Sequence, residues 1–199
     1  LGKAGDASAI SELVVSLTDP MRNVREAAVL AMIESFERHP EQVKEQLASC
    51  ERGPIVVAVS TYLAEDFNDS LKRASIRILG WLGATDSVQP LLRLLEYDSL
   101  QQDALVALVD IGGANSQALL DSWSAVAGQQ RAYLAYVLGE ARCVDSLPLL
   151  QQGLRDDEPQ IVRMSAYALG KIGAVQMLPD LVACLQNVSS EVQDAASQA

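Results

Sequence analysis

The chain has 199 residues, of which 49% are hydrophobic and 21% are charged, a composition typical of a globular protein with a sizeable core. Its net charge of −11 argues against nonspecific nucleic-acid binding, because that binding depends on clustered basic groups. No apolar run approaches the roughly 20 residues that a membrane span requires, so we expect no membrane contact.

Short amphipathic helices and Ala-rich helices are predicted to alternate along the chain. The first Ala-rich helix includes 24–28 and follows the turn at 18–20, and an additional helix is expected near 41–50. The later segments, in chain order, are 78–84, 87–95, 107–113, 137–141, 146–150, 163–174 and 177–185. Their leucines recur at i, i+3 and i+4, and no window alternates with period two, so the predicted fold class is all-α.

One motif recurs at a nearly constant interval. Its index positions, Gly80, Val109, Gly139 and Gly170, are 29, 30 and 31 residues apart. We interpret the periodic glycines as close-packing and C-cap residues. Partial copies of the motif stand at 1–5 and 191–196. We therefore expect 1–199 to be a single domain of about six helical-pair repeats, cut at both ends from a longer array.

The motif resembles HEAT repeats, in the roughly 30-residue form found in phycobilisome bilin lyases and in many scaffolds. An Asp-containing turn precedes Val-Arg, Ala-Ala and Ala-Leu-Gly. These positions are Asp19, Val24, Arg25, Ala27, Ala28 and Ala31 in one unit, and Asp156, Ile161, Ala166, Ala168, Leu169 and Gly170 in another. The resemblance implies a right-handed α–α superhelix of the HEAT/armadillo solenoid type. Arg163 stands one place later than the arginine of the motif, so its usual contact with the turn aspartate is left open.

The sequence contains few residues or motifs that are typical of catalytic or metal-binding sites. His39 is the single histidine, which argues against the usual metal clusters and Ser–His or Cys–His nucleophile systems. No phosphate-binding loop or nucleophile-elbow motif is present. Asp156, Asp157 and Glu158 are interpreted as a solvated turn. We therefore expect no enzymatic activity, no cofactor and no metal.

The face of the Ala-rich helices that points away from their packing is the candidate site. Its positions follow i, i+4, i+8 on each helix. Trp, Tyr and Arg often anchor protein interfaces, because they combine large contact area with hydrogen bonding. The predicted partner-binding residues are Arg73, Arg77, Trp81, Tyr136, Glu140, Arg163, Tyr167 and Lys171. An acidic or amphipathic peptide suits the four cations among them.

Two alternatives remain open for these residues. In the first, Trp81 and the tyrosines pack over the seams between repeats and the arginines pair with aspartates of the chain itself. In the second, which the family resemblance implies, the chain is a bilin lyase-type protein. Arg73, Arg77 or Arg163 then pairs with the propionates of an open-chain tetrapyrrole, and Trp81, Tyr136 and Tyr167 stack on it. Trp123, in contrast, is predicted to lie in the core.

The predicted function is a noncatalytic scaffold that holds a partner protein or peptide along its concave face. The cysteines, Cys50, Cys143 and Cys184, are odd in number, widely spaced and without a C-x-x-C pair. They are interpreted as reduced thiols, which predicts a cytoplasmic location.

Overall fold

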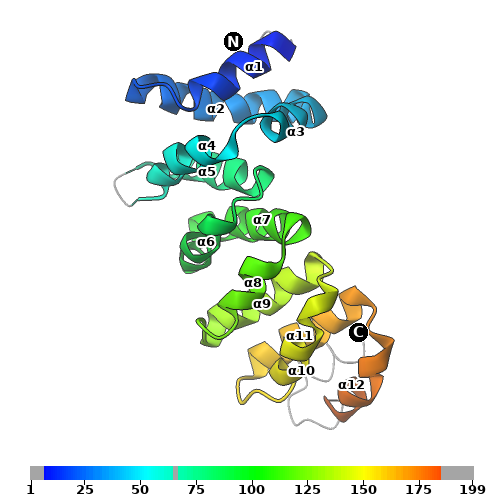
Figure 1. The fold of residues 1–199 in the computed structure, drawn as a ribbon. Helices are drawn as coiled ribbons and strands as arrows, with labels where there is room; N and C mark the ends of the chain where they lie inside the picture. Colours follow the sequence, from blue (N-terminus) through cyan, green and yellow to red (C-terminus); the bar gives the residue numbers. More distant parts are fainter. Residues whose placement is uncertain (1–6, 65–66, 185–199) are drawn as a thin grey trace.

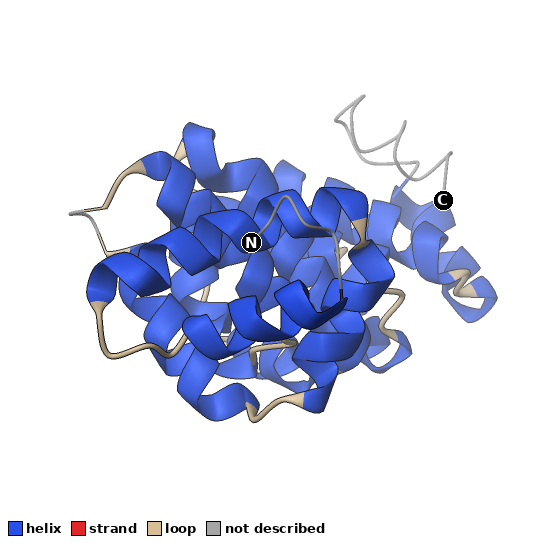
Figure 2. Cartoon of the chain, turned by 90° about the horizontal axis from the view of Figure 1, so that it is seen from above, coloured by secondary structure: helices blue, strands red, loops and turns tan. Residues whose placement is uncertain are grey.

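The computed structural model describes residues 7–64 and 67–184, and within these ranges every regular element is a helix (Figure 2). The α-helices are α1 (Ala7–Ser16), α2 (Arg22–Arg38), α3 (Pro40–Ser49), α4 (Arg52–Ser60), α5 (Asp69–Trp81), α6 (Val88–Leu94), α7 (Asp98–Ala114), α8 (Gln117–Ser122), α9 (Gly128–Glu140), α10 (Leu147–Gly153), α11 (Pro159–Ile172) and α12 (Leu178–Cys184). Short 3₁₀ helices span Thr61–Leu63, Thr85–Ser87, Val144–Ser146 and Val175–Met177. The predicted all-α fold class is confirmed. The partial repeats expected at 1–5 and 191–196 lie outside the described residues.

The helices stack in one direction, from α1 to α12, as an α–α solenoid (Figure 1). The longer helices α2, α5, α7, α9 and α11 form one layer, in which each contacts the next. The shorter helices α1, α4, α6 and α10 each pack against the longer helix that follows, and α8 packs against α6 and α7. We call the face of the longer helices that is not covered by the shorter ones the inner face.

The apolar core runs along the stack as two clusters that meet at α5. One cluster joins α1 to α5 and includes Leu71 and Leu79 of α5, whereas the other runs from Ile76 of α5 to Leu181 of α12. Trp123 is only 4% exposed and belongs to the second cluster, so its predicted core position is confirmed. Because each repeat fills its core with its neighbour's side chains, no single helix pair is self-sufficient.

The turns before the longer helices are fixed by side chains. The Asp19 carboxylate accepts a hydrogen bond from the Met21 backbone N–H at 2.7 Å, and Asp156 accepts one from the Glu158 N–H at 3.0 Å. Arg25 donates to the Asp19 carbonyl oxygen at 2.7 Å, so it braces the turn through the backbone. These contacts satisfy backbone groups that a helix start leaves unpaired.

Glycines set the spacing of the longer helices. A Cβ atom added at Gly80 would lie 2.8 Å from the Ala107 Cα atom, and one added at Gly139 would lie 2.6 Å from the Ala168 Cα atom. Helices α5 and α7, and likewise α9 and α11, therefore approach closely, as predicted. The index position of α7 is Val109 instead, and α7 contacts α9 less extensively. Gly113 has open space around its Cβ direction and is not a close-packing residue.

Helix α3 occupies Pro40–Ser49 and packs against α1 and α2. Pro40 is its first residue, where the missing backbone N–H costs no intrahelical bond. Its interpretation as an element added to the repeat stays a prediction. Helix α4, which follows directly, is the shorter helix that packs on α5.

Candidate interaction surface on the inner face

The fifteen outward positions at i, i+4 and i+8 on the five longer helices, which we call the stripe, have intermediate to high exposure with one exception. They are Glu26, Leu30, Glu34, Arg73, Arg77, Trp81, Gln102, Val106, Asp110, Ala132, Tyr136, Glu140, Arg163, Tyr167 and Lys171. Leu30 on α2 is 44% exposed and Val106 on α7 is 46% exposed, so the stripe includes accessible apolar side chains. Ala132 on α9 is the exception, since it is 4% exposed. The helical period of 3.6 explains this pattern, because rows at i and i+4 stay on one side of each helix.

Four of the eight predicted residues form one contact cluster between α9 and α11, which we call the tyrosine cluster: Tyr136, Glu140, Tyr167 and Lys171. The rings of Tyr136 and Tyr167 stack with centroids 5.6 Å apart and planes at 17°. The Tyr167 hydroxyl donates to Glu140 Oε1, and the same oxygen lies 3.1 Å from Lys171 Nζ. The Lys171 ammonium also lies 5.3 Å from the centroid of the Tyr167 ring.

Electrostatics in the tyrosine cluster follow from these contacts. The hydrogen bond from Tyr167, helped by Lys171, lowers the pKa of Glu140. Burial, followed by the contact with Glu140, raises the pKa of Tyr167. Hydrogen bonding to Tyr167 and Glu140 raises the pKa of Lys171. Near neutral pH the cluster therefore holds an ionised carboxylate, a neutral phenol and an ammonium.

The α5 residues of the predicted site have other neighbours. Trp81 is half-buried and stacks on Phe36 of α2, with centroids 3.9 Å apart and planes at 14°. Arg73 Nε lies 3.9 Å from Asp103 Oδ2 on α7, a long ion pair that is partly exposed. The seam-packing alternative thus describes Trp81, Arg73 and the stacked Tyr136 and Tyr167 in part, because each of these contacts joins two successive longer helices. Phe36 was not among the predicted site residues, because it lies across the long interval between the first two units.

The two remaining cations stand apart from the tyrosine cluster. Arg77 is half-buried and has no ion pair or hydrogen bond with the described residues. The Nε atom of Arg163 is buried without a hydrogen-bond partner in the described part of the chain. The turn carboxylate of Asp156 is instead reached by Arg131 of α9, at 3.3 Å. This answers the open question about Arg163, whose place at the turn is taken by a residue of the preceding repeat.

A hollow of about 160 Å³ opens on the inner face between α7 and α9, and we call it the α7–α9 hollow. It is lined by Gln102, Leu105, Val106, Val109, Asp110, Tyr136 and Glu140. Desolvation raises the pKa of Asp110, and the positive charge of Lys44 partly opposes that rise. The sequence places Gln102, Val106 and Asp110 of α7 on the outward-facing stripe, but none of them is among the eight predicted partner-binding residues. A signal for this seam was available in Val109, which stands where α5, α9 and α11 have the index glycine.

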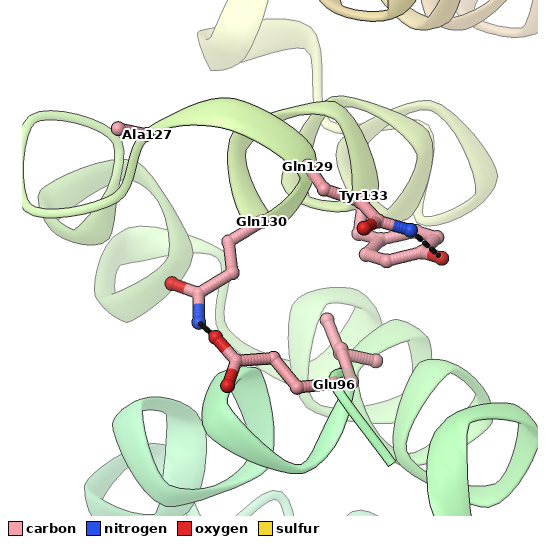
Figure 3. Close-up of a pocket in the computed structure, with 6 residues that line it drawn as sticks. Glu96, Ala127, Gln129, Gln130 and Tyr133 are labelled. Atoms are coloured by element: carbon pink, nitrogen blue, oxygen red, sulfur yellow. Dashed lines mark hydrogen bonds between the residues drawn. The ribbon is translucent and has the colours of Figure 1, made fainter. Parts of the chain in front are cut away.

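A second hollow, of about 420 Å³, lies between the end of α6 and the start of α9 (Figure 3). Its polar side chains bond to one another. Gln130 donates to Glu96 Oε1 at 2.6 Å, and the Tyr133 hydroxyl oxygen accepts from Gln129 at 2.7 Å. Tyr133 also accepts from Gln101 of α7 at 2.7 Å. This hollow is therefore a polar seam between repeats whose groups are already satisfied, and it is a weaker candidate.

The described part of the chain contains no group of three or more His, Cys, Asp and Glu residues arranged to hold a metal ion. Among the described helices, none combines the length and the apolar character that crossing a lipid bilayer demands.

Two family models match the sequence. The model described as HEAT repeats matches residues 116–199, and the model described as PBS lyase HEAT-like repeat matches residues 71–97. No curated protein matches the chain.

Several solved structures are similar to the chain at low sequence identity. The complex of CpcE and CpcF of phycocyanin lyase from Nostoc sp. is 19% identical over 92% of this chain and 73% of that chain, with a TM-score of 0.41. Human deoxyhypusine hydroxylase in complex with glycerol is 15% identical over 96% of this chain and 94% of that chain, with a TM-score of 0.43. An engineered protein gives the same identity, coverage and TM-score as the human hydroxylase.

Proposed function

Since this chain is a HEAT-like repeat protein, we propose that it is a noncatalytic scaffold whose inner face holds a partner protein or peptide. The observation that carries this proposal is the continuity of contact groups over successive longer helices. The Phe36–Trp81 stack, the exposed Val106 and the tyrosine cluster share that face. Large aromatic and apolar groups that stay accessible on a folded surface are the usual anchors of interfaces.

Rigidity supports the same proposal. Tyr136 and Tyr167 are held against each other, and Tyr167 is also fixed by its bond to Glu140. Side chains that are ordered before binding lose less conformational entropy when a partner arrives, which favours affinity. The tyrosine cluster is thus organised as a contact surface without needing a ligand.

We also propose a cytoplasmic location and a protein partner, on the basis of the cysteines and of the net charge. Cys50 and Cys143 are free thiols, in keeping with a cytoplasmic protein. The net charge of −11 favours neither nucleic acid nor an anionic membrane surface. Arg77 and Arg163 remain available for acidic residues within a partner segment, because Lys171 and Arg73 already have acidic neighbours.

Replacing Val106 by arginine is expected to abolish partner capture, because the long side chain fills the α7–α9 hollow. Val106 is 46% exposed, so the variant should fold with unchanged helicity. The matched control is Val57→Arg on α4, where Val57 is 69% exposed among the shorter helices. Tagged protein is incubated with native cell extract, and the captured proteins are quantified by mass spectrometry. A partner retained by Val106→Arg and lost by Val57→Arg contradicts binding on the inner face.

The match to the PBS lyase HEAT-like repeat model favours a second candidate, a bilin lyase-type subunit that binds an open-chain tetrapyrrole. Arg77 and Arg163 are the cations best placed to meet propionates. However, the α7–α9 hollow has only about 160 Å³, whereas pockets for small molecules start at about 300 Å³. Mixing the protein with phycocyanobilin separates the candidates. The scaffold leaves the absorbance band unchanged, and a shifted band that Arg77→Ala removes favours the lyase-type subunit.

A further inference from the structure

Among the three seams that join α5, α7, α9 and α11, the α7–α9 seam is the one whose index position is not a glycine. At Gly80 and Gly139 the next helix comes within van der Waals contact of the backbone. At the same register α7 carries Val109, and its side chain forms part of the wall. The hollow thus coincides with the replacement of an index glycine by valine.

The charged groups that line the hollow are both carboxylates, Asp110 on α7 and Glu140 on α9. The Asp110 side chain makes no hydrogen bond or ion pair with the described residues, and Lys44 acts on it only through its positive charge. Glu140 uses one oxygen, Oε1, for both Tyr167 and Lys171. No hydrogen bond from the described residues is directed at its other oxygen, Oε2, although Arg142 acts on Glu140 through its charge.

The rest of the wall is apolar or aromatic. Leu105, Val106 and Val109 line it from α7, and Tyr136 lines it from α9. Tyr136 is held by its stack on Tyr167, so its position is fixed. Such a wall suits the methylene stem of a long side chain, and a tyrosine ring also attracts a cation.

We infer that the α7–α9 hollow receives one arginine or lysine side chain from the partner segment, with its charged head between Asp110 and Glu140. This inference rests on the proposed scaffold function and adds the chemistry of one anchor. A volume of about 160 Å³ fits a single side chain and falls short of the roughly 300 Å³ of a small-molecule pocket. The net charge of −11 also attracts a segment that carries basic residues. The inferred anchor is opposite in sign to the partner that the cations of the stripe alone suggest.

The test selects peptides from a random 12-residue library displayed on phage, using the whole chain as the target. Peptides that compete with one another are synthesised, and their Kd values are measured for the wild type and for Asp110→Asn. The amide keeps the shape of the side chain and removes its charge at an exposed position. Asp157→Asn, in the exposed turn before α11, is the matched control. We expect Arg or Lys to be enriched, and Asp110→Asn to weaken binding about tenfold with no effect of Asp157→Asn.

Each other outcome overturns the inference. Peptides that lose binding to Val106→Arg but lack enriched basic residues, or that bind Asp110→Asn as tightly as the wild type, refute the basic anchor and leave the scaffold proposal standing. Peptides that bind Val106→Arg as tightly as the wild type, or a library that yields no binder, count against both. Replacing the enriched arginine by citrulline in the peptide should weaken binding to the wild type by a larger factor than binding to Asp110→Asn, which keeps only Glu140.

Discussion

Replacing Gly139 by alanine is expected to lower the free energy of unfolding by about 3 kcal/mol, because overpacking a closed helix seam forces backbones apart. The new Cβ atom would lie 2.6 Å from the Ala168 Cα atom and 2.7 Å from its Cβ atom. Both atoms belong to Ala168 of α11, and neither can move without moving the backbone of that helix. Helices α9 and α11 must therefore separate, which also loosens the tyrosine cluster. Urea unfolding followed by circular dichroism gives the change.

The matched control is Gly113→Ala, in helix α7. Nothing lies within 4 Å of the Cβ position at Gly113, so alanine adds only helix propensity. We expect this variant to be unchanged or more stable by about 0.5–1 kcal/mol. If both variants lose the same stability, the loss at Gly139 cannot be attributed to overpacking of the seam between α9 and α11.

The repeat and its seams were accessible from the sequence because they depend on local rules. Helical spacing of leucines predicted the alternating helices, and the index glycines predicted where α5 meets α7 and where α9 meets α11. Val109 is equally informative, because a valine at an index position does not allow two helices to approach as closely as a glycine does. Its consequence, the α7–α9 hollow, became visible only once the neighbouring helix was placed.

Contacts within the candidate site depended on the register between helices, which periodicity alone does not determine. Glu140 and Lys171 are 31 residues apart, one repeat, and they meet because the contact of Gly139 with Ala168 aligns α9 with α11. Phe36 and Trp81 meet across an interval that contains α3 and α4, where the repeat spacing fails. The stripe was therefore predictable, whereas the partners of its side chains were not.

Arg131 is a structural residue that motif reasoning missed, and replacing it by glutamine is expected to cost about 2 kcal/mol, because it removes charge-assisted hydrogen bonds from a partly buried site. Its guanidinium donates to the Val126 carbonyl oxygen through Nε at 3.0 Å and Nη2 at 2.7 Å. Nη1 lies 3.3 Å from Asp156 Oδ2, which joins two successive turns. The guanidinium carbon also lies 5.9 Å from the Trp123 ring centroid. Thermal and urea unfolding measure the loss.

The contribution of Arg131 to stability should depend on the geometry of its guanidinium group and not on its charge alone. Arg131→Lys keeps the positive charge but cannot donate to Val126 and Asp156 in the same forked arrangement, so it should recover only part of the stability. Arg155→Gln is the matched control, because Arg155 pairs with Asp180 at 3.2 Å while its side chain is 70% exposed. An exposed pair of this kind is worth less than about 1 kcal/mol. Equal losses for Arg131→Gln and Arg155→Gln, or full recovery by lysine, would mean that the turns between repeats are held by packing without this brace.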